Sequence, residues 1–214
     1  MPAAIFERRY RGKWPAGCGS SYLRLTGPSW ETVQHRPAFG SCARRYAGIV
    51  KPMSPEIIRA SFINASLGEI ERISLPGLHE VLWENREYLG WRDSSAHQRG
   101  YLAHWSGDSA VGIVLRASEF SLQNGISAMC SLCRISQPSG QVSLFSAARA
   151  GQAGRDGNTV GTYICDDLAC SHLIRILPPS SLMQPSREEL LASRTDGLLA
   201  RVQGFTSDVA STAR

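Results

Sequence analysis

The 214-residue sequence has no long hydrophobic run, and this absence excludes two classes of protein. No run approaches the roughly 18 apolar residues that are needed to span a bilayer. No apolar stretch of about 7–15 residues follows the basic N-terminus, as a secretory signal would require. The default compartment is therefore the cytoplasm, where thiols stay reduced. We expect a cytoplasmic protein with no membrane partner.

Lysine is absent after Lys51, and the basic charge is unevenly distributed. Residues 1–52 contain nine Lys and Arg against two Asp and Glu, a net charge of +7, whereas residues 53–214 contain 14 against 16, a net charge of −2. The overall charge of +5 therefore describes the N-terminal quarter and does not make the rest a nucleic-acid-binding domain.

Residues 1–52 also lack any sustained helix or strand periodicity, because Gly and Pro interrupt every apolar group. We expect this segment to be a disordered extension whose arginines face solvent or an anionic partner such as RNA. An alternative is that the natural protein starts at Met53. Ser54 and Pro55 follow as a good helix N-cap and first helical residue.

From residue 53 to about 210 the pattern is that of one α+β domain. Helical spacing predicts helices at 55–65, 167–176 and 187–209, with Ser186 as the N-cap of the last and Gly68 as a C-cap after the first. Alternating and β-branched runs predict strands at 88–91, 100–105, 110–117, 141–147 and 159–165. The segment Ser106-Gly107-Asp108 predicts a hairpin turn, and residues 150–158 form a glycine-rich loop between two strands.

Four of the six cysteines form two close pairs with the spacing of a zinc site. Cys130 and Cys133 make a CxxC, and Cys165 and Cys170 make a CxxxxC about 30 residues later. Structural zinc takes four ligands in a tetrahedron, and two such pairs supply them if the intervening hairpin brings the chain back. This arrangement is a treble clef, in which a tight CxxC turn (the zinc knuckle) is followed by a hairpin and then by a helix that carries the last ligands. Its core is predicted at 128–177. We therefore predict one structural Zn²⁺ and an antiparallel sheet with flanking helices.

Other roles for these cysteines fit less well. A thioredoxin-type redox pair would leave the second pair unexplained, and two disulfides would need an oxidising compartment. A catalytic zinc keeps an open coordination position, which four thiolates close. A zinc deaminase would show H-x-E before P-C-x-x-C, and the chain has neither. One alternative stays open, which is His172 in place of Cys170 as the fourth ligand. Cys18 and Cys42 are expected to be free thiols.

No group of residues predicts an active site. The histidines are scattered without HExxH or a paired carboxylate, and Asp166 and Asp167 are expected to cap a helix. The glycine-rich segment 151–157 lacks the Lys-Ser/Thr of a P-loop. We expect a binding protein with no small-molecule substrate, and not an enzyme.

The zinc motif and its neighbours resemble the C-terminal zinc-binding domain of elongation factor G-binding proteins, the FusB-type fusidic-acid-resistance family. The resemblance rests on the four cysteines, 142–145, 161–165 and the leading strands 89–93, 101–102 and 111–115. It is closest to short actinobacterial-type versions that have the zinc domain without the family's N-terminal helical bundle.

This resemblance implies a protein that binds elongation factor G and helps it to leave the ribosome, without catalysis. It also implies that Phe145 and Tyr163 lie at aromatic contact positions on the zinc-domain sheet. Each ring has an alternative place in the hydrophobic core. The alternative function is an RNA- or ribosome-binding zinc finger that does not act on elongation factor G and that uses the basic residues 1–52.

Overall fold

The computed structural model describes residues 51–119, 125–179 and 185–211. None of the helices in these ranges is long and apolar enough to cross a membrane. The expectations for residues 1–50, which include the free thiols Cys18 and Cys42 and the contact with RNA, lie outside the described residues.

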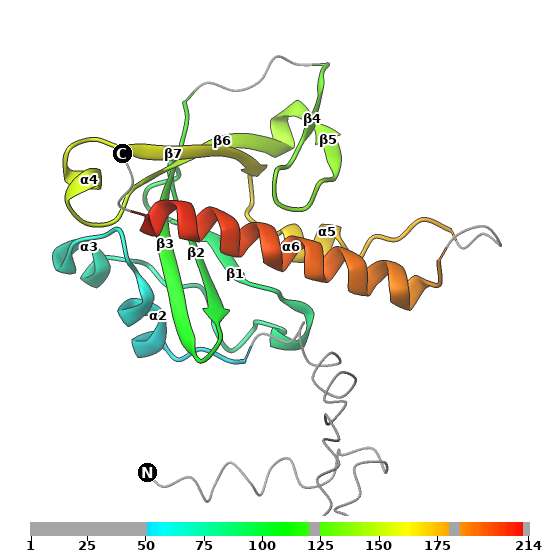
Figure 1. Cartoon of the computed structure of the whole chain (residues 1–214), viewed down its shortest axis with the longest axis horizontal. Helices are drawn as coiled ribbons and strands as arrows, with labels where there is room; N and C mark the ends of the chain where they lie inside the picture. Colours follow the sequence, from blue (N-terminus) through cyan, green and yellow to red (C-terminus); the bar gives the residue numbers. More distant parts are fainter. Residues whose placement is uncertain (1–50, 120–124, 180–184, 212–214) are drawn as a thin grey trace, which may run out of the picture. The chain divides into compact units, whose positions relative to one another are not determined.

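A five-stranded antiparallel sheet organises the described chain (Figure 1), with the strand order β1-β2-β3-β6-β7. Its strands are β1 (Leu89–Arg92), β2 (Arg99–Ser106), β3 (Ser109–Ala117), β6 (Val142–Ala148) and β7 (Thr159–Cys165). All five lie within one residue of their predicted bounds. A two-residue turn, Gly107-Asp108, joins β2 to β3, and Gly107 has the positive φ of 62° that glycine adopts without strain.

A second, two-stranded sheet was not predicted from the sequence. It consists of β4 (Ser127–Met129) and β5 (Ser136–Pro138), and it is followed by the 3₁₀ turn η3 (Ser139–Gln141). Its strands are too short to show a periodicity of two. Together they bring the ends of the Cys130–Cys133 loop close to each other, so this small sheet is the stem of the predicted knuckle.

Both faces of the sheet are covered at β2, which is therefore buried over five consecutive residues. On one face, Leu102 and Ile113 pack in a cluster with Leu198 and Val202 of α6 (Arg187–Ala210), which crosses the sheet in Figure 1. On the other face, aromatic rings of β1 and β2 pack against α2 (Pro55–Ser61) and the segment 70–83. The rings of Trp91 and Tyr101 lie there with centroids 5.0 Å apart.

The helix α2 begins as predicted and ends four residues early. The Ser54 hydroxyl accepts a hydrogen bond from the Ile57 N–H at 3.3 Å, as an N-cap does. Beyond Ser61 the chain turns onto the sheet, since the Ile63 N–H donates to the Gly112 carbonyl at 3.0 Å. The Asn64 side chain donates to the Val114 carbonyl at 3.0 Å. Hydrogen bonds to β3 thus replace the last helical turn.

Two further predictions for this part of the fold are wrong, and a third, the glycine-rich loop between two strands, is confirmed but contains a helix. Gly68 is not a C-cap, because it lies inside the short helix α3 (Leu67–Glu71), which starts with a capping box of Ser66 and Glu69. The glycine-rich loop contains the short helix α4 (Gly151–Arg155). The helix predicted at 167–176 is only α5 (Cys170–Leu173), because Leu168 has a φ of 57° and interrupts helical backbone before Cys170.

Candidate metal centre

The four cysteines of the two pairs meet at one place, although they come from three elements. Cys130 directly follows β4, and Cys133 lies in the turn after it. Cys165 ends β7, and Cys170 is the first residue of α5. All four side chains are buried, and their Sγ atoms lie within 4.8 Å of one another.

The spacing of the sulfur atoms fits a tetrahedral zinc ion. The Sγ–Sγ distances are 3.6 Å for Cys130 to Cys170, 3.6 Å for Cys133 to Cys165 and 3.5 Å for Cys165 to Cys170. A tetrahedron with Zn–S bonds of about 2.3 Å has edges of about 3.8 Å. Thiolate sulfur is also the donor that structural zinc favours. The group holds one structural Zn²⁺, and four sulfur ligands would leave no position open for a substrate.

His172, the alternative fourth ligand, is exposed and is not part of the metal-binding group. The short helix α5 places Cys170 toward the other sulfur atoms at its first residue. Two residues later the chain has turned by about 200° around the helix, so the side chain of His172 faces away. Cys170 is therefore the residue that completes the donor set.

Backbone and side-chain N–H groups donate hydrogen bonds to the cysteine sulfur atoms and stabilise the site. The N–H groups of Leu132 and Cys133 donate to the Cys130 Sγ at 3.3 and 3.4 Å. The buried side chain of Gln137 donates through Nε2 to the Cys165 Sγ at 3.2 Å. Gln137 was not found from the sequence, because nothing in its spacing marks it. Only the pairing of β4 with β5 brings it to the sulfur cluster.

The electrostatics of the cluster favour a cation. Hydrogen bonds from the thiols of Cys133, Cys165 and Cys170 lower the pKa of Cys130. The hydrogen bond with Cys130 raises the pKa of Cys170. The pKa values of the thiols are thus moved in opposite directions, because several negative charges at this distance repel each other. A dication at the centre removes this conflict and allows all four sulfur atoms to ionise.

The sequence from residue 57 to residue 209 matches the family model described as FBP C-terminal treble-clef zinc-finger. This range contains all four cysteines and more than half of the chain. The protein belongs to this family.

Other comparisons of this FBP zinc-finger protein are more distant. The solved structure of the fusidic acid resistance protein FusC is 16% identical in sequence, with a TM-score of 0.48. The match covers 77% of this chain and 62% of the FusC chain, so this protein spans less than two thirds of the length of FusC. No curated protein matches the sequence.

The two aromatic residues for which the resemblance implies a contact role lie in different environments. Phe145 is 0% exposed and lies in the main core cluster, with the Arg92 guanidinium 5.0 Å from the centre of its ring. A surface position for Phe145 is therefore wrong, because its side of β6 faces the core. Tyr163 is 40% exposed and lies on the opposite side of the sheet, beside Leu144.

The aspartates Asp166 and Asp167 have structural partners. Asp166 accepts a hydrogen bond from the Ser143 hydroxyl at 2.6 Å. Asp167 accepts one from the Ala169 N–H at 2.9 Å, which stabilises the turn before α5. Within the part of the chain that the structure describes, neither carboxylate lies in a group with a histidine that could act with it.

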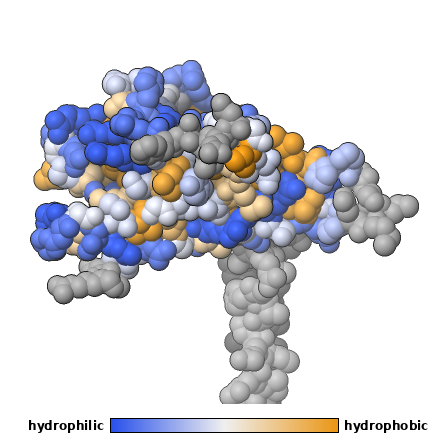
Figure 2. All heavy atoms as spheres, turned by 90° about the horizontal axis from the view of Figure 1, so that it is seen from above, coloured by the Kyte–Doolittle hydropathy of each residue, from blue (hydrophilic) through white to orange (hydrophobic). Residues whose placement is uncertain are grey.

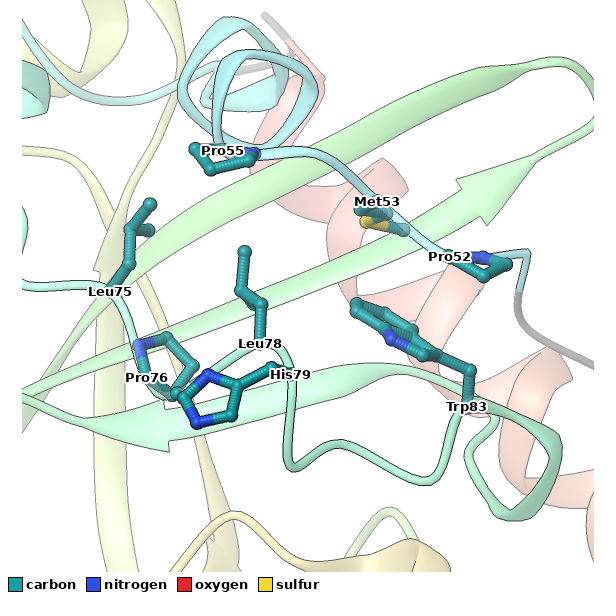
Figure 3. A pocket seen from close by; sticks show the side chains of 9 residues that line it. Pro52, Met53, Pro55, Leu75, Pro76, Leu78, His79 and Trp83 are labelled. Carbon is teal, nitrogen blue, oxygen red and sulfur yellow. The ribbon is translucent and has the colours of Figure 1, made fainter. Parts of the chain in front are cut away.

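An open apolar groove of about 560 Å³ lies apart from the cysteines (Figure 3). Met53, Leu75, Leu78 and Trp83 line it, together with prolines and His79. Within the described residues, His79 is its only titratable lining group, and that side chain is 84% exposed. This lining offers apolar contact and no acid–base pair.

Proposed function

We propose that this protein binds elongation factor G and modulates its release from the ribosome, without catalysing a reaction. The observation that carries the proposal is the family match over residues 57–209, in the domain where the resemblance to elongation factor G-binding proteins also lies. A closed four-thiolate zinc site supports binding over catalysis, because zinc with four sulfur ligands organises the fold and has no position for a substrate.

The surface near the zinc loop, the turn from Cys130 to Cys133, has features of a protein contact. Tyr163 is 40% exposed and Met129, which ends β4, is 52% exposed. The two are linked through the backbone, since the Ser131 N–H donates to the Tyr163 carbonyl at 2.8 Å. Aromatic residues and Met are enriched in protein interfaces. Figure 2 shows the molecule from the side of β6 and β7, with hydrophobic groups among hydrophilic ones.

An alternative partner is RNA, alone or in the ribosome. Residues 1–52 carry a net charge of +7, which would bring phosphate contacts and an affinity that falls steeply with salt. Residues 53–214 carry a net charge of −2, which disfavours an RNA-binding role for the zinc domain itself. Loss of ribosome association on deletion of residues 1–52 would favour this alternative.

The proposal is tested by titration calorimetry of the zinc-loaded full-length chain against elongation factor G of the same organism at physiological salt. We expect a Kd in the micromolar range or lower. Tyr163→Ala should weaken binding roughly 30-fold, as the truncation of an aromatic anchor does. Leu82→Ala, at an exposed apolar residue before the 3₁₀ turn η2 (Trp83–Asn85), is the matched control and should leave the affinity unchanged. No heat of binding with the wild-type chain would refute the proposed function.

A further inference from the structure

The strand β7 is an edge of the main sheet, and its register determines which of its backbone groups face outward. It pairs with β6 alone. Just beyond the paired strands, the Arg149 N–H donates to the Asn158 carbonyl at 2.9 Å and the Asp166 N–H donates to the Gln141 carbonyl at 2.9 Å. Antiparallel strands alternate between hydrogen-bonded and non-hydrogen-bonded pairs. The N–H and C=O groups of residues 160, 162 and 164 therefore bond to β6.

The alternate residues of β7 direct their N–H and C=O groups away from the sheet. Of these groups, the Tyr163 carbonyl accepts the bond from Ser131 at 2.8 Å. The N–H and C=O groups of Thr159, both groups of Gly161 and the N–H of Tyr163 have no hydrogen-bond partner among the described residues. All three residues are exposed. Five groups are thus aligned and open to solvent.

Between residues 159 and 163, this edge lacks several of the features with which proteins usually protect a free strand. Edge strands are commonly protected by lysine, proline, an inward charge or a bulge. From residue 159 to residue 163, β7 has no charged residue and no proline, and its pairing with β6 has no bulge.

The open edge has a defined length. At its start, the Asn158 N–H donates to the Ala153 carbonyl of α4 at 3.0 Å, and at its end the zinc loop covers the Tyr163 carbonyl. Five residues lie between these limits, a length of about 17 Å in extended backbone.

We infer that this edge of β7 is a docking site for one extended, proline-free segment of the protein's partner, which adds to the sheet as a sixth strand. The row of alternating donors and acceptors selects an extended backbone, because only that conformation presents the complementary groups at the same repeat. The inference rests on the proposed function, since it takes elongation factor G as the partner that supplies the segment.

Side chains beside the edge give the site a preference for particular sequences. On the side of the sheet that faces away from the core, Tyr163 and Leu144 are cross-strand neighbours. A residue of the added strand opposite Tyr163 would pack on the exposed ring, and β-branched and aromatic residues make the most favourable cross-strand pairs. Gly161 leaves the middle of the edge open for close approach of a second backbone.

The zinc loop takes part in this site. Ser131 lies between two of the cysteines, and its hydrogen bond to Tyr163 determines where the open edge ends. Zinc bound to these cysteines would thus hold the loop at the end of the open edge. Loss of the metal would free the loop and change the end of the site.

Amide-resolved hydrogen exchange of the zinc-loaded full-length chain, alone and with saturating elongation factor G, tests this inference. In the free protein the amides of Gly161 and Tyr163 should exchange rapidly, whereas those of Thr162 and Ile164, bonded to β6, should be protected. On binding, the exchange of the first two should slow by roughly tenfold or more. The amides of Thr162 and Ile164 serve as internal controls for the sheet itself.

A matched pair of variants tests the same edge by affinity. Gly161→Pro removes an outward N–H and leaves the bonds to β6 intact, a position at which edge strands tolerate proline. Gly161→Ala retains the N–H, and its added Cβ would meet ordinary contacts, at 3.5 Å from the Phe145 carbonyl oxygen and 3.8 Å from Leu144. We expect Gly161→Pro to weaken binding at least about tenfold, and Gly161→Ala to bind as the wild type does.

The possible outcomes separate this inference from the proposed function. Binding with unprotected Gly161 and Tyr163 amides would overturn strand addition and leave elongation factor G as the partner. Absence of binding by the wild-type chain would overturn both. Protection that grows with protein concentration, without elongation factor G, would show that a second copy occupies the edge and would also overturn the inference. If Gly161→Pro loses zinc or unfolds, the hydrogen-exchange measurement on the wild type decides whether a strand is added at this edge.

Discussion

Some buried polar residues in this protein are positioned by hydrogen bonds that join distant parts of the chain. His104 of β2 lies in the core with its Nε2 atom 2.9 Å from the Thr206 hydroxyl of α6 and its Nδ1 atom 3.1 Å from the Trp105 carbonyl. In the sequence it was one of several scattered histidines with no assigned role. Its position on the side of β2 that faces α6 gives it a structural function.

His104 should make the free energy of unfolding depend on pH. Burial lowers the pKa of His104 below its ordinary value of 6.5, and the bond with Trp105 only partly opposes this. Below about pH 6.5 the unfolded chain binds a proton that the folded chain does not, so stability falls with the pH, by up to about 1.4 kcal/mol per pH unit. Urea unfolding between pH 7.5 and 5.5, with zinc present, measures this loss.

The control for this prediction is His104→Gln, which removes the titrating group. The variant should be less stable at pH 7.5, because its amide does not reproduce the ring's packing, and its stability should change less with pH than that of the wild type. An equal pH dependence in the two proteins would assign the effect to other groups.

At the scale of elements, the strands of the main sheet were predicted closely and the short helices were not. Strands β2 and β3 carry long runs of apolar and β-branched residues and a two-residue turn, so local patterns determine them. The helices α3 and α4 have five residues each, too few for a helical periodicity. The N-cap of α6 was predicted correctly, and Ser186 and Glu189 form a complete capping box there.

Gly204 should lower the stability of α6, and replacing it tests this effect. It lies exposed in the helix interior, and a Cβ added there would have no atom within 4 Å. Gly204→Ala should therefore raise the free energy of unfolding by about 1 kcal/mol, and the Tm by about 2–4 °C in thermal unfolding. The contrasting variant is Gly90→Ala in β1, where the Cβ would lie 2.5 Å from the Leu168 carbonyl oxygen. That change should destabilise the protein.

At the scale of the whole molecule, the zinc site is part of the main hydrophobic core. All four cysteines belong to the same buried cluster as Leu102 of β2 and Leu198 of α6. A partly buried ion pair adds a second connection, since Arg175 donates to both carboxylate oxygens of Glu87 at 2.8 and 3.0 Å. These contacts join the start of the sheet to the segment that follows the last cysteine.

Removal of zinc should therefore unfold more than the zinc loop. Apparent free energies of zinc binding are about 10–16 kcal/mol, and domain stabilities are about 5–15 kcal/mol. Cys165→Ser should abolish stoichiometric zinc in elemental analysis and the cooperative unfolding transition, because a hydroxyl is a poor zinc ligand. Chelation of the wild type should have the same effect. A metal-free protein with an unchanged transition would contradict a structural role for the ion.

The sequence by itself determined the four cysteines, the family and the five strands of the main sheet. Each of these can be predicted from the spacing of nearby residues, because ligand motifs and alternating strands involve residues a few positions apart. Only the tertiary structure decided that Gln137 bonds to a zinc ligand, that Phe145 is buried and that one edge of β7 is open. These properties depend on which strands become neighbours, and that is determined by packing between residues far apart in the chain.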